Sequence, residues 1–275
     1  MRRQFLTIVA FLSACSFYAC GPAGESTQET ATETETVEEV APALSISPAP
    51  ASPEYADAML EATGPTDGST LTSGDSVEFT YGVTNYELGA PTPDADQKPL
   101  AASPKGQHVH LILNNNPYHA IYQTEGFKLA LEDGHYVALS FLSRSYHESV
   151  KNPEAYKVSQ FTVGEGETED IDLSQPMLFY SRPKGTYSGA DAESVLFDFY
   201  LANTEIGPGG NQVKVSINSD TTFMVNQWQP YVIQGMPMGE NTISIELVDS
   251  EGNLVDSPMN SVSRTFTLKE ADPAM

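Results

Sequence analysis

The chain has 275 residues, and its 37 Asp and Glu against 13 Lys and Arg give it a formal net charge of −24 at pH 7. Such acidity argues against nucleic-acid binding, which needs a basic face, and against electrostatic adhesion to anionic membranes. The two cysteines both lie near the N-terminus, so a folded body beyond them must be stabilised by its core rather than by disulfides.

The N-terminus has the pattern of a secretory signal. Arg2 and Arg3 precede the apolar segment FLTIVAFLSA, which is too short to span a bilayer, so residues 1–19 are predicted to be a lipoprotein signal peptide. Cys15 follows Leu-Ser-Ala, as in a bacterial lipobox, whereas Cys20 directly precedes a polar segment. We favour Cys20 as the lipidated residue, with Cys15 as the alternative, because lipidation of Cys20 leaves no free thiol in an oxidising periplasm.

Residues 20–54 are rich in Thr, Glu, Ala, Ser and Pro and contain no Lys or Arg. Such a segment buries too little apolar surface to offset the entropy lost on ordering, so it is predicted to be a disordered tether. The signal and the tether together predict a protein held at a membrane by an N-terminal lipid. The expected location is the cell envelope of a Gram-negative bacterium, at the periplasmic or surface face of the outer membrane.

Beyond the tether, the chain contains two copies of one pattern. The segments DSVEFTYGVTNYELG (75–89) and ESVLFDFYLANTEIG (193–207) share Ser, Val, Phe, Asn, Glu and Gly in register, and Pro65 corresponds to Pro183. The first copy is longer because residues 90–105 have no counterpart in the second. This insertion is rich in Pro, Ala and Asp and is predicted to be a surface loop.

Apolar and polar residues alternate in both copies with the period of two that is typical of strands. The residues assigned to core-facing positions in the first copy are Val77, Phe79, Tyr81, Val83, Val109, Leu111, Leu113, Val137, Leu139 and Phe141. Their counterparts in the second copy are Val195, Phe197, Phe199, Leu201, Val213, Val215, Ile217, Ile243, Ile245 and Leu247. No long amphipathic helix is indicated in either copy.

About 100 residues per copy is the size of a seven-stranded antiparallel sandwich. We therefore predict an all-β chain with two tandem immunoglobulin-like antiparallel β-sandwich domains after the disordered tether. The first domain is expected over residues 55–163 and the second over 176–270, joined by an acidic linker at 164–175. A single larger sandwich built from both halves is the alternative.

All five histidines belong to the first copy. His108 and His110 alternate with core-facing residues of one strand, so they are expected side by side on the face turned away from the core. His135 opens a later strand, and His147 follows the end of that strand. Two imidazoles at i and i+2, completed by a ligand from a neighbouring strand, can hold Zn or Cu, which makes these four histidines candidate metal ligands. Otherwise they are ordinary surface or hydrogen-bonding histidines.

Basic residues are sparse, but several of them fall between positions 144 and 184, near the junction of the two copies. Arginine forms strong charge-assisted hydrogen bonds with phosphate, so this group is a candidate anion-binding site. Its members are Arg144, Ser145, His147, Lys151, Arg182 and Lys184. The alternative is that these positive charges only offset neighbouring carboxylates.

The run Ser143-Arg144-Ser145-Tyr146-His147 resembles the Ser-Arg-x-His element of forkhead-associated domains, with the His one residue later. Those domains are β-sandwiches that bind phosphothreonine peptides, so the resemblance implies phosphopeptide binding. A wider resemblance is carried by SPEYADAMLEATGPTDG, GQHVHLILNNNPYHAIY, FLSRSYHESVKNPEAY and MLFYSRPKGTYSG. These segments resemble an uncharacterised family of Bacteroidota lipoproteins whose members are often described as phosphopeptide-binding proteins.

The first copy is also similar to a periplasmic His-rich domain of unknown function. That domain is built around an HHHLL strand, a Pro-Gly-x-His turn and a later His. Here His108, His110, His135 and His147 stand at those positions, with Glu-Asp-Gly at 132–134 where that domain has Pro-Gly. The resemblance implies a shared role for the four histidines and no established activity.

No nucleophile elbow, zincin motif, P-loop or dinucleotide fingerprint is present. We therefore predict a non-enzymatic, lipid-anchored envelope protein that binds a protein, a peptide or a metal. The first alternative is a periplasmic Zn- or Cu-binding protein that uses the histidines of the first domain. The second is phosphopeptide or anion binding at the domain junction. Zn or Cu is the only cofactor indicated.

Overall fold

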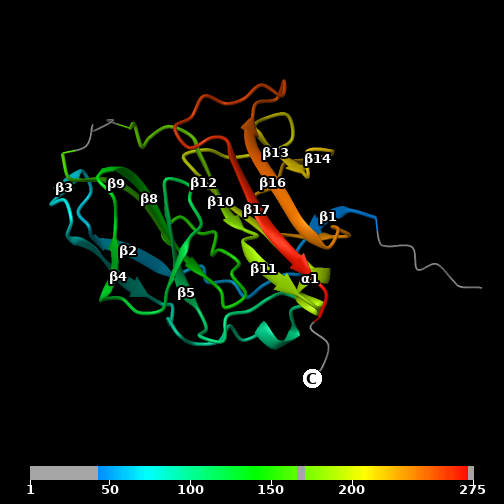
Figure 1. Ribbon diagram of the computed structural model, residues 1–275, viewed down its shortest axis with the longest axis horizontal. Coiled ribbons are helices and arrows are strands. Elements are labelled where there is room, and N and C mark those ends of the chain that lie inside the picture. The colour runs from blue at the N-terminus through cyan, green and yellow to red at the C-terminus, as the bar shows by residue number, and fades with distance from the viewer. Residues whose placement is uncertain (1–42, 166–170, 272–275) are drawn as a thin grey trace, which may run out of the picture. The chain divides into compact units, whose positions relative to one another are not determined.

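The computed structural model describes residues 43–165 and 171–271. The predicted signal peptide, both candidate lipidation cysteines (Cys15 and Cys20), residues 20–42 of the tether and part of the linker lie outside the described residues. The regular secondary structure of the described residues is almost entirely β-strand (Figure 1), with one short helix, α1 (Ala190–Glu193), and one 3-10 turn, η1 (Ala95–Gln97). None of its helices is long and apolar enough to cross a membrane.

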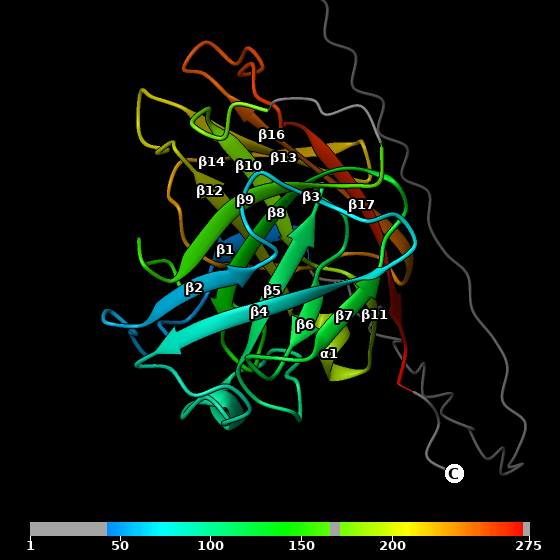
Figure 2. The ribbon, with the colours of Figure 1, turned by 90° about the vertical axis from the view of Figure 1, so that its left-hand side faces the viewer.

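The first copy forms a sandwich of two sheets. Its strands are β2 (Met59–Gly64), β3 (Ser69–Leu71), β4 (Ser76–Thr84), β5 (His108–Leu113), β6 (His119–Ile121), β7 (Phe127–Ala130), β8 (Gly134–Ser143) and β9 (Tyr156–Val163). One sheet has the order β2-β4-β7, and the other has the order β3-β9-β8-β5-β6. In Figure 2, β2 and β4 are seen in front of β5, β8 and β9, so the two layers lie one behind the other.

The second copy forms a sandwich of the same design. Its strands are β10 (Met177–Arg182), β11 (Gly185–Ser188), β12 (Val195–Ala202), β13 (Gln212–Ile217), β14 (Thr221–Val225), β15 (Tyr231–Gln234), β16 (Gly239–Val248) and β17 (Val262–Lys269). Its five-stranded sheet has the order β11-β17-β16-β13-β14, and its other sheet contains β15-β12-β10. Every strand therefore has a counterpart in the first copy. The matching pairs β3–β9 and β11–β17 are both parallel, and the matching strands β2 and β10 both carry a register shift.

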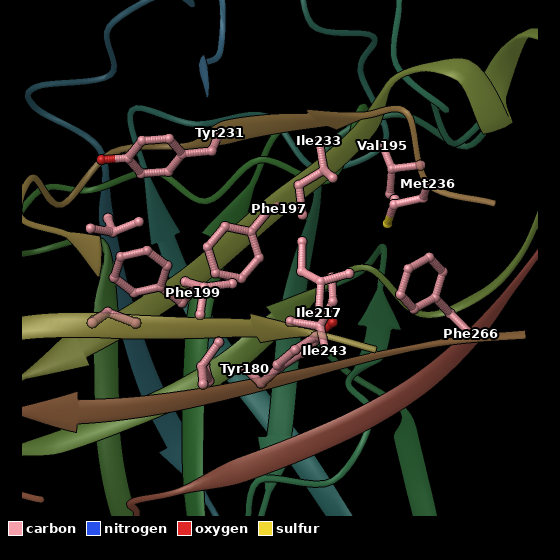
Figure 3. Packing of buried hydrophobic residues seen from close by; sticks show 14 of the residues in the cluster. Tyr180, Val195, Phe197, Phe199, Ile217, Tyr231, Ile233, Met236, Ile243 and Phe266 are labelled. Carbon is pink, nitrogen blue, oxygen red and sulfur yellow. The ribbon is translucent and has the colours of Figure 1, made fainter. Parts of the chain in front are cut away.

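Each sandwich has its own core. Val77, Phe79 and Tyr81 of β4 pack with Val109 and Leu111 of β5 in the first. In the second, side chains of β12 and β15 point toward those of β13 and β16 across the space between the sheets (Figure 3). The all-β prediction and the prediction of tandem β-sandwiches are confirmed. The alternative of a single larger sandwich is wrong, because each copy closes two sheets around a separate core.

The predicted core face of β8 is wrong. Ala138 and Leu142 face the core of the first sandwich, whereas Val137, Leu139 and Phe141 face the opposite side. The pairings explain the error, because Leu142 lies opposite Val109 just as Leu247 lies opposite Val213. The true correspondence is therefore shifted by one residue from the one expected, and a shift of one residue exchanges the two faces of a strand.

The large side chains on the outer face of β8 pack against the second sandwich. Phe141 stacks on Tyr200 with ring centroids 4.8 Å apart, and both residues are fully buried. Met177 and Phe179 of β10 belong to the same cluster. The described residues, 43–165 and 171–271, accordingly belong to one compact unit. The outer face of the β5–β8 pair is therefore an interior surface of the molecule.

The end of the predicted tether is ordered, which corrects the expectation of disorder for residues 20–54 in its described part. Strand β1 (Ser45–Pro48) pairs antiparallel with β15 and extends the smaller sheet of the second sandwich. Ile46 packs against the core of that sandwich. Residues 45–54, which we call the N-terminal strap, then reach the first sandwich, where Arg144 donates a hydrogen bond to the Pro53 carbonyl (2.5 Å).

Candidate metal centre

His108 and His110 lie on β5 and point away from the core of the first sandwich, as the alternation predicted. They are not surface residues, however, since both are 0% exposed. The ring of Tyr118 stacks on His110 at 3.5 Å between centroids, and Phe141 lies edge-on to it at 5.0 Å. Ser181 of the second sandwich lies 3.4 Å from His110 Nδ1. Sequence alternation gave the direction of these side chains but not the second sandwich that covers them.

His147 meets the same two histidines from the loop that follows β8. The Nε2 atoms of His108 and His110 are 2.9 Å apart, and His108 Nε2 is 3.1 Å from His147 Nδ1. All three nitrogens lie within 4.8 Å of one another. Tetrahedral coordination with Zn–N bonds of about 2.0–2.1 Å separates ligand nitrogens by roughly 3.3 Å. The His108–His110 and His108–His147 separations therefore differ from the tetrahedral value by only a few tenths of an ångström.

The loop that presents His147 is held in place by buried contacts. His147 has a left-handed backbone conformation, with φ 68°, and its amide donates to the Arg144 carbonyl at 2.9 Å. Arg144 in turn pairs with Glu148 at 3.0 Å. The Ser145 amide donates to Thr92 Oγ1 at 2.9 Å, so part of the 90–105 insertion packs against this loop instead of forming only a surface loop.

The tautomer of His108 follows from its backbone partner. His108 Nδ1 lies 2.8 Å from the Gly106 carbonyl oxygen, which can only accept, so Nδ1 carries the proton. Nε2 of the neutral ring then has a single in-plane lone pair, yet it faces nitrogens of both His110 and His147. One lone pair accepts one well-aligned hydrogen bond. A metal ion among the three nitrogens would satisfy all of these contacts together.

All three imidazoles are held in the neutral form that binds metals. Burial lowers the pKa of His108 to about 4, although the bond to Gly106 acts in the opposite direction. Burial also lowers the pKa of His110 and of His147 well below the ordinary value of 6.5, and for His147 the next cause is the charge of Arg182. The site therefore offers unprotonated nitrogens over the whole neutral range.

Tyr118 is a neighbour of the cluster that sequence reasoning missed. Its hydroxyl lies 3.1 Å from His147 Nδ1, and burial raises the pKa of this phenol, which keeps it protonated. Its position beside His119 in the segment NPYHAIY carries no distinctive pattern, so only the folded chain identifies it. Gly106 was missed for the same reason, because its contribution is a backbone carbonyl.

His135 is not part of the cluster, which corrects the expected set of four ligands. It stands at the start of β8, whereas His108 pairs with Ser143 at the other end of that strand. The two ring nitrogens of His135 are satisfied by Thr162 Oγ1 at 3.1 Å and Gln160 Oε1 at 3.0 Å. His119 also lies apart, beside Phe127.

The six residues proposed for anion binding do not form one site. Arg144 is paired with Glu148, and Lys151 is paired with the fully buried Asp198 at 2.5 Å. Ser145 is bonded to Thr92. Only Arg182 and Lys184 remain near His147, where their charges contribute to its lowered pKa. The separation of the set follows from burial, because a buried cation requires a local counter-charge or hydrogen bonds.

Comparisons with known proteins give no family for this chain. No family model matches it, and no curated protein matches it. The matching solved structures include the fibronectin(III)-like modules of Clostridium thermocellum CbhA, with 11% identity, a TM-score of 0.27, and coverage of 78% of this chain and 95% of that one.

Two further matches are of the same kind. The tandem V-type regions of the chitin-binding protein VCBP3 have 8% identity and a TM-score of 0.23, covering 77% of this chain and 99% of that one. The Bacteroides ovatus protein SGBP-B, solved with a mixed-linkage heptasaccharide, has 11% identity and a TM-score of 0.22, covering 76% of this chain and 47% of that one. Such scores are too low to indicate a shared function.

Proposed function

We propose that this chain is a non-enzymatic, lipid-anchored protein of the cell envelope that binds one transition-metal ion, Zn or Cu, through His108, His110 and His147. The observation that carries the proposal is the single lone pair of His108 Nε2 facing two other imidazole nitrogens at 2.9 and 3.1 Å. Zn and Cu are among the metals that imidazole ligands suit.

Burial supports binding rather than catalysis at this site. Two of the three ligands are fully buried, and aromatic rings of Tyr118, Tyr122 and Phe141 surround them. A catalytic metal needs an open position that a substrate can reach, and the burial of His108 and His110 restricts access to this site. The fixed tautomer of His108 and the stacked ring of His110 are the kind of outer contacts that orient metal ligands.

Element analysis of the full chain, purified without a polyhistidine tag, tests this proposal. We expect about one Zn or Cu per chain, as set by one three-nitrogen site. The variant His108→Gln/His110→Gln should lose the metal. The matched control is His135→Gln, which removes an imidazole outside the cluster and should retain it. Wild-type protein that binds neither Zn nor Cu more tightly than about micromolar would contradict the proposal.

The anchoring part of the proposal depends on the sequence alone and has its own test. Metabolic labelling with a fatty acid should label the wild-type chain. The Cys20→Ser variant should lose the label, and Cys15→Ser should keep it. The opposite result would move the lipid to Cys15, and labelling of both single variants and of the double variant would exclude both cysteines.

A further inference from the structure

Two cations of the second sandwich stand next to the histidine cluster. Arg182, at the end of β10, is 7% exposed; its Nη1 donates to the Tyr187 hydroxyl at 2.8 Å, but its Nε is buried without a partner. Lys184 follows it and donates to the Tyr118 carbonyl at 2.7 Å. The Lys184 ammonium and the Arg182 guanidinium lie 3.8 and 5.1 Å from the centroid of the Tyr118 ring.

These cations have no carboxylate partner. Among the ion pairs of residues 43–165 and 171–271, none includes Arg182, Lys184 or the neighbouring Arg264. By contrast, the buried Arg144 and the partly buried Lys151 each have one. Burial and the charges of Arg182 and Arg264 lower the pKa of Lys184 to about 8. A chain with 37 acidic residues has thus left a partly buried positive region without a carboxylate beside three neutral imidazoles.

We infer that the metal takes a small inorganic anion as its fourth ligand, and that Arg182 and Lys184 hold this anion. The inference rests on the proposed metal site. Three imidazoles leave the charge of a divalent ion uncompensated, and the two cations add repulsion to it. An anion between the metal and the cations would cancel both effects. It would also supply an acceptor for the unpartnered Nε of Arg182.

The geometry of the protein ligands agrees with this role. Among the described residues, the cluster contains three ligand groups and no carboxylate, so a tetrahedral ion keeps one position for an external ligand. The Tyr118 hydroxyl, at 3.1 Å from His147 Nδ1, is a further donor near that position. The second sandwich would therefore contribute to metal binding through charge, although the three protein ligands all come from the first.

Cobalt(II) titration of the full, metal-free chain tests the inference, because the visible absorption of the ion reports its coordination. The titrations are made at one ionic strength in sodium perchlorate, in sodium chloride and in sodium bicarbonate. We expect cobalt to bind about tenfold or more tightly when chloride or bicarbonate replaces perchlorate, with a changed absorption band. Lys184→Met should reduce this anion dependence and strengthen binding in perchlorate.

Lys214→Met is the charge-matched control, because Lys214 lies on the partly exposed face of β13, and it should retain the full anion dependence. Arg182→Met is the second variant, and it should behave like Lys184→Met. Equal cobalt affinity and equal spectra in all three salts would overturn the inference while leaving metal binding intact. Anion dependence that survives in both Lys184→Met and Arg182→Met would overturn it as well. Absence of cobalt binding in every salt would contradict the metal site itself.

Discussion

The five-stranded sheets of the two sandwiches have the same order and register, but their outer faces have different surroundings. Every residue of β5 is buried, whereas residues of β13 alternate between buried and half-buried. The cross-strand pair His110–Phe141 of the first sheet corresponds to Lys214–Glu246 of the second. There the two side chains form an ion pair at 2.8 Å with 40% and 32% of their surfaces exposed.

The difference shows that the repeated sheet sets the direction of a side chain, while its neighbours set its chemistry. The same strand position carries a charged, solvated lysine in one copy and a neutral, buried imidazole in the other. Covering the first face with the second sandwich lowers the pKa of the histidines and brings Arg182 and Lys184 to them. A chain with two identical exposed faces would provide neither condition.

The largest effect is expected from weakening the packing between the two sandwiches. Phe141→Ala deletes a fully buried ring that stacks on Tyr200 between the sandwiches, and such truncations cost about 3–5 kcal/mol of unfolding free energy. Urea unfolding measures this loss. The matched control is Glu246→Ala, at the equivalent place in the second sheet, which should change stability by about 0.5 kcal/mol or less. Similar losses in the two variants would show that the faces do not differ in burial.

The fold was largely predictable because the alternation in each copy is local and regular. Val77, Phe79 and Tyr81 face the first core as expected. The orientation of β8 was not predictable, because Val137, Leu139 and Phe141 are large apolar residues that face the other sandwich, while Ala138 and Leu142 face the core. Both faces of such a strand are apolar, so its period no longer identifies the core. Strand β1 was not predicted, because the polar composition of the surrounding segment indicates disorder, although Leu44 and Ile46 alternate with polar residues.

The candidate site was predicted in part for a similar reason. The i and i+2 spacing of His108 and His110 is a local signal, and it correctly indicated that they lie side by side. The contribution of His147 depends on a loop turn with positive φ, and the exclusion of His135 depends on the antiparallel register of β5 and β8. Both are non-local properties. Burial of the site depends on the packing of the second sandwich, which no pattern within the first copy encodes.

The next largest effect is a loss of stability on acidification, caused by the buried imidazoles. The folded pKa of His108 is about 4 against an ordinary 6.5, so the unfolded chain binds protons more readily between these values. The contribution of His108 to the unfolding free energy is complete above about pH 7 and is lost progressively as the pH falls toward 4. For His108 alone the loss is about 3 kcal/mol, and His110 and His147 act in the same direction.

Urea unfolding of the metal-free chain at several values between pH 7.5 and pH 4.5 measures this effect. Burial raises the pKa of Glu148, so this carboxyl stabilises the fold on acidification and opposes the effect of the histidines. The informative quantity is therefore the difference in unfolding free energy between the wild type and His108→Gln at each pH. The variant should show the shallower dependence on pH. Parallel profiles would indicate that His108 has an ordinary pKa in the folded protein.

A smaller effect is expected at the N-terminal strap, which links β15 of the second sandwich to the His147 loop of the first. Ile46→Asp places a charge against the second core, and we expect it to lower the unfolding free energy by about 1–2 kcal/mol. It should also weaken metal binding, because the strap accepts a hydrogen bond from Arg144 beside His147. Ser47→Asp, on the exposed side of β1, is the control and should change neither quantity. Identical behaviour of the two variants would show that the strap adds nothing to the second sheet.

The smallest effect on stability is expected from grafting the histidine pair onto the second sheet. Gln212→His/Lys214→His reproduces the spacing of His108 and His110 on the equivalent strand, and we combine it with His108→Gln/His110→Gln to remove the original site. The grafted imidazoles lie on a half-exposed face without a third histidine, so zinc should bind at least about 100-fold more weakly than to the wild type. Loss of the partly exposed Lys214–Glu246 pair should cost about 0.5 kcal/mol or less. Zinc titration with competing chelators measures the difference. Wild-type affinity in the graft would mean that strand spacing alone makes the site, and that neither His147 nor the cover of the second sandwich contributes to it.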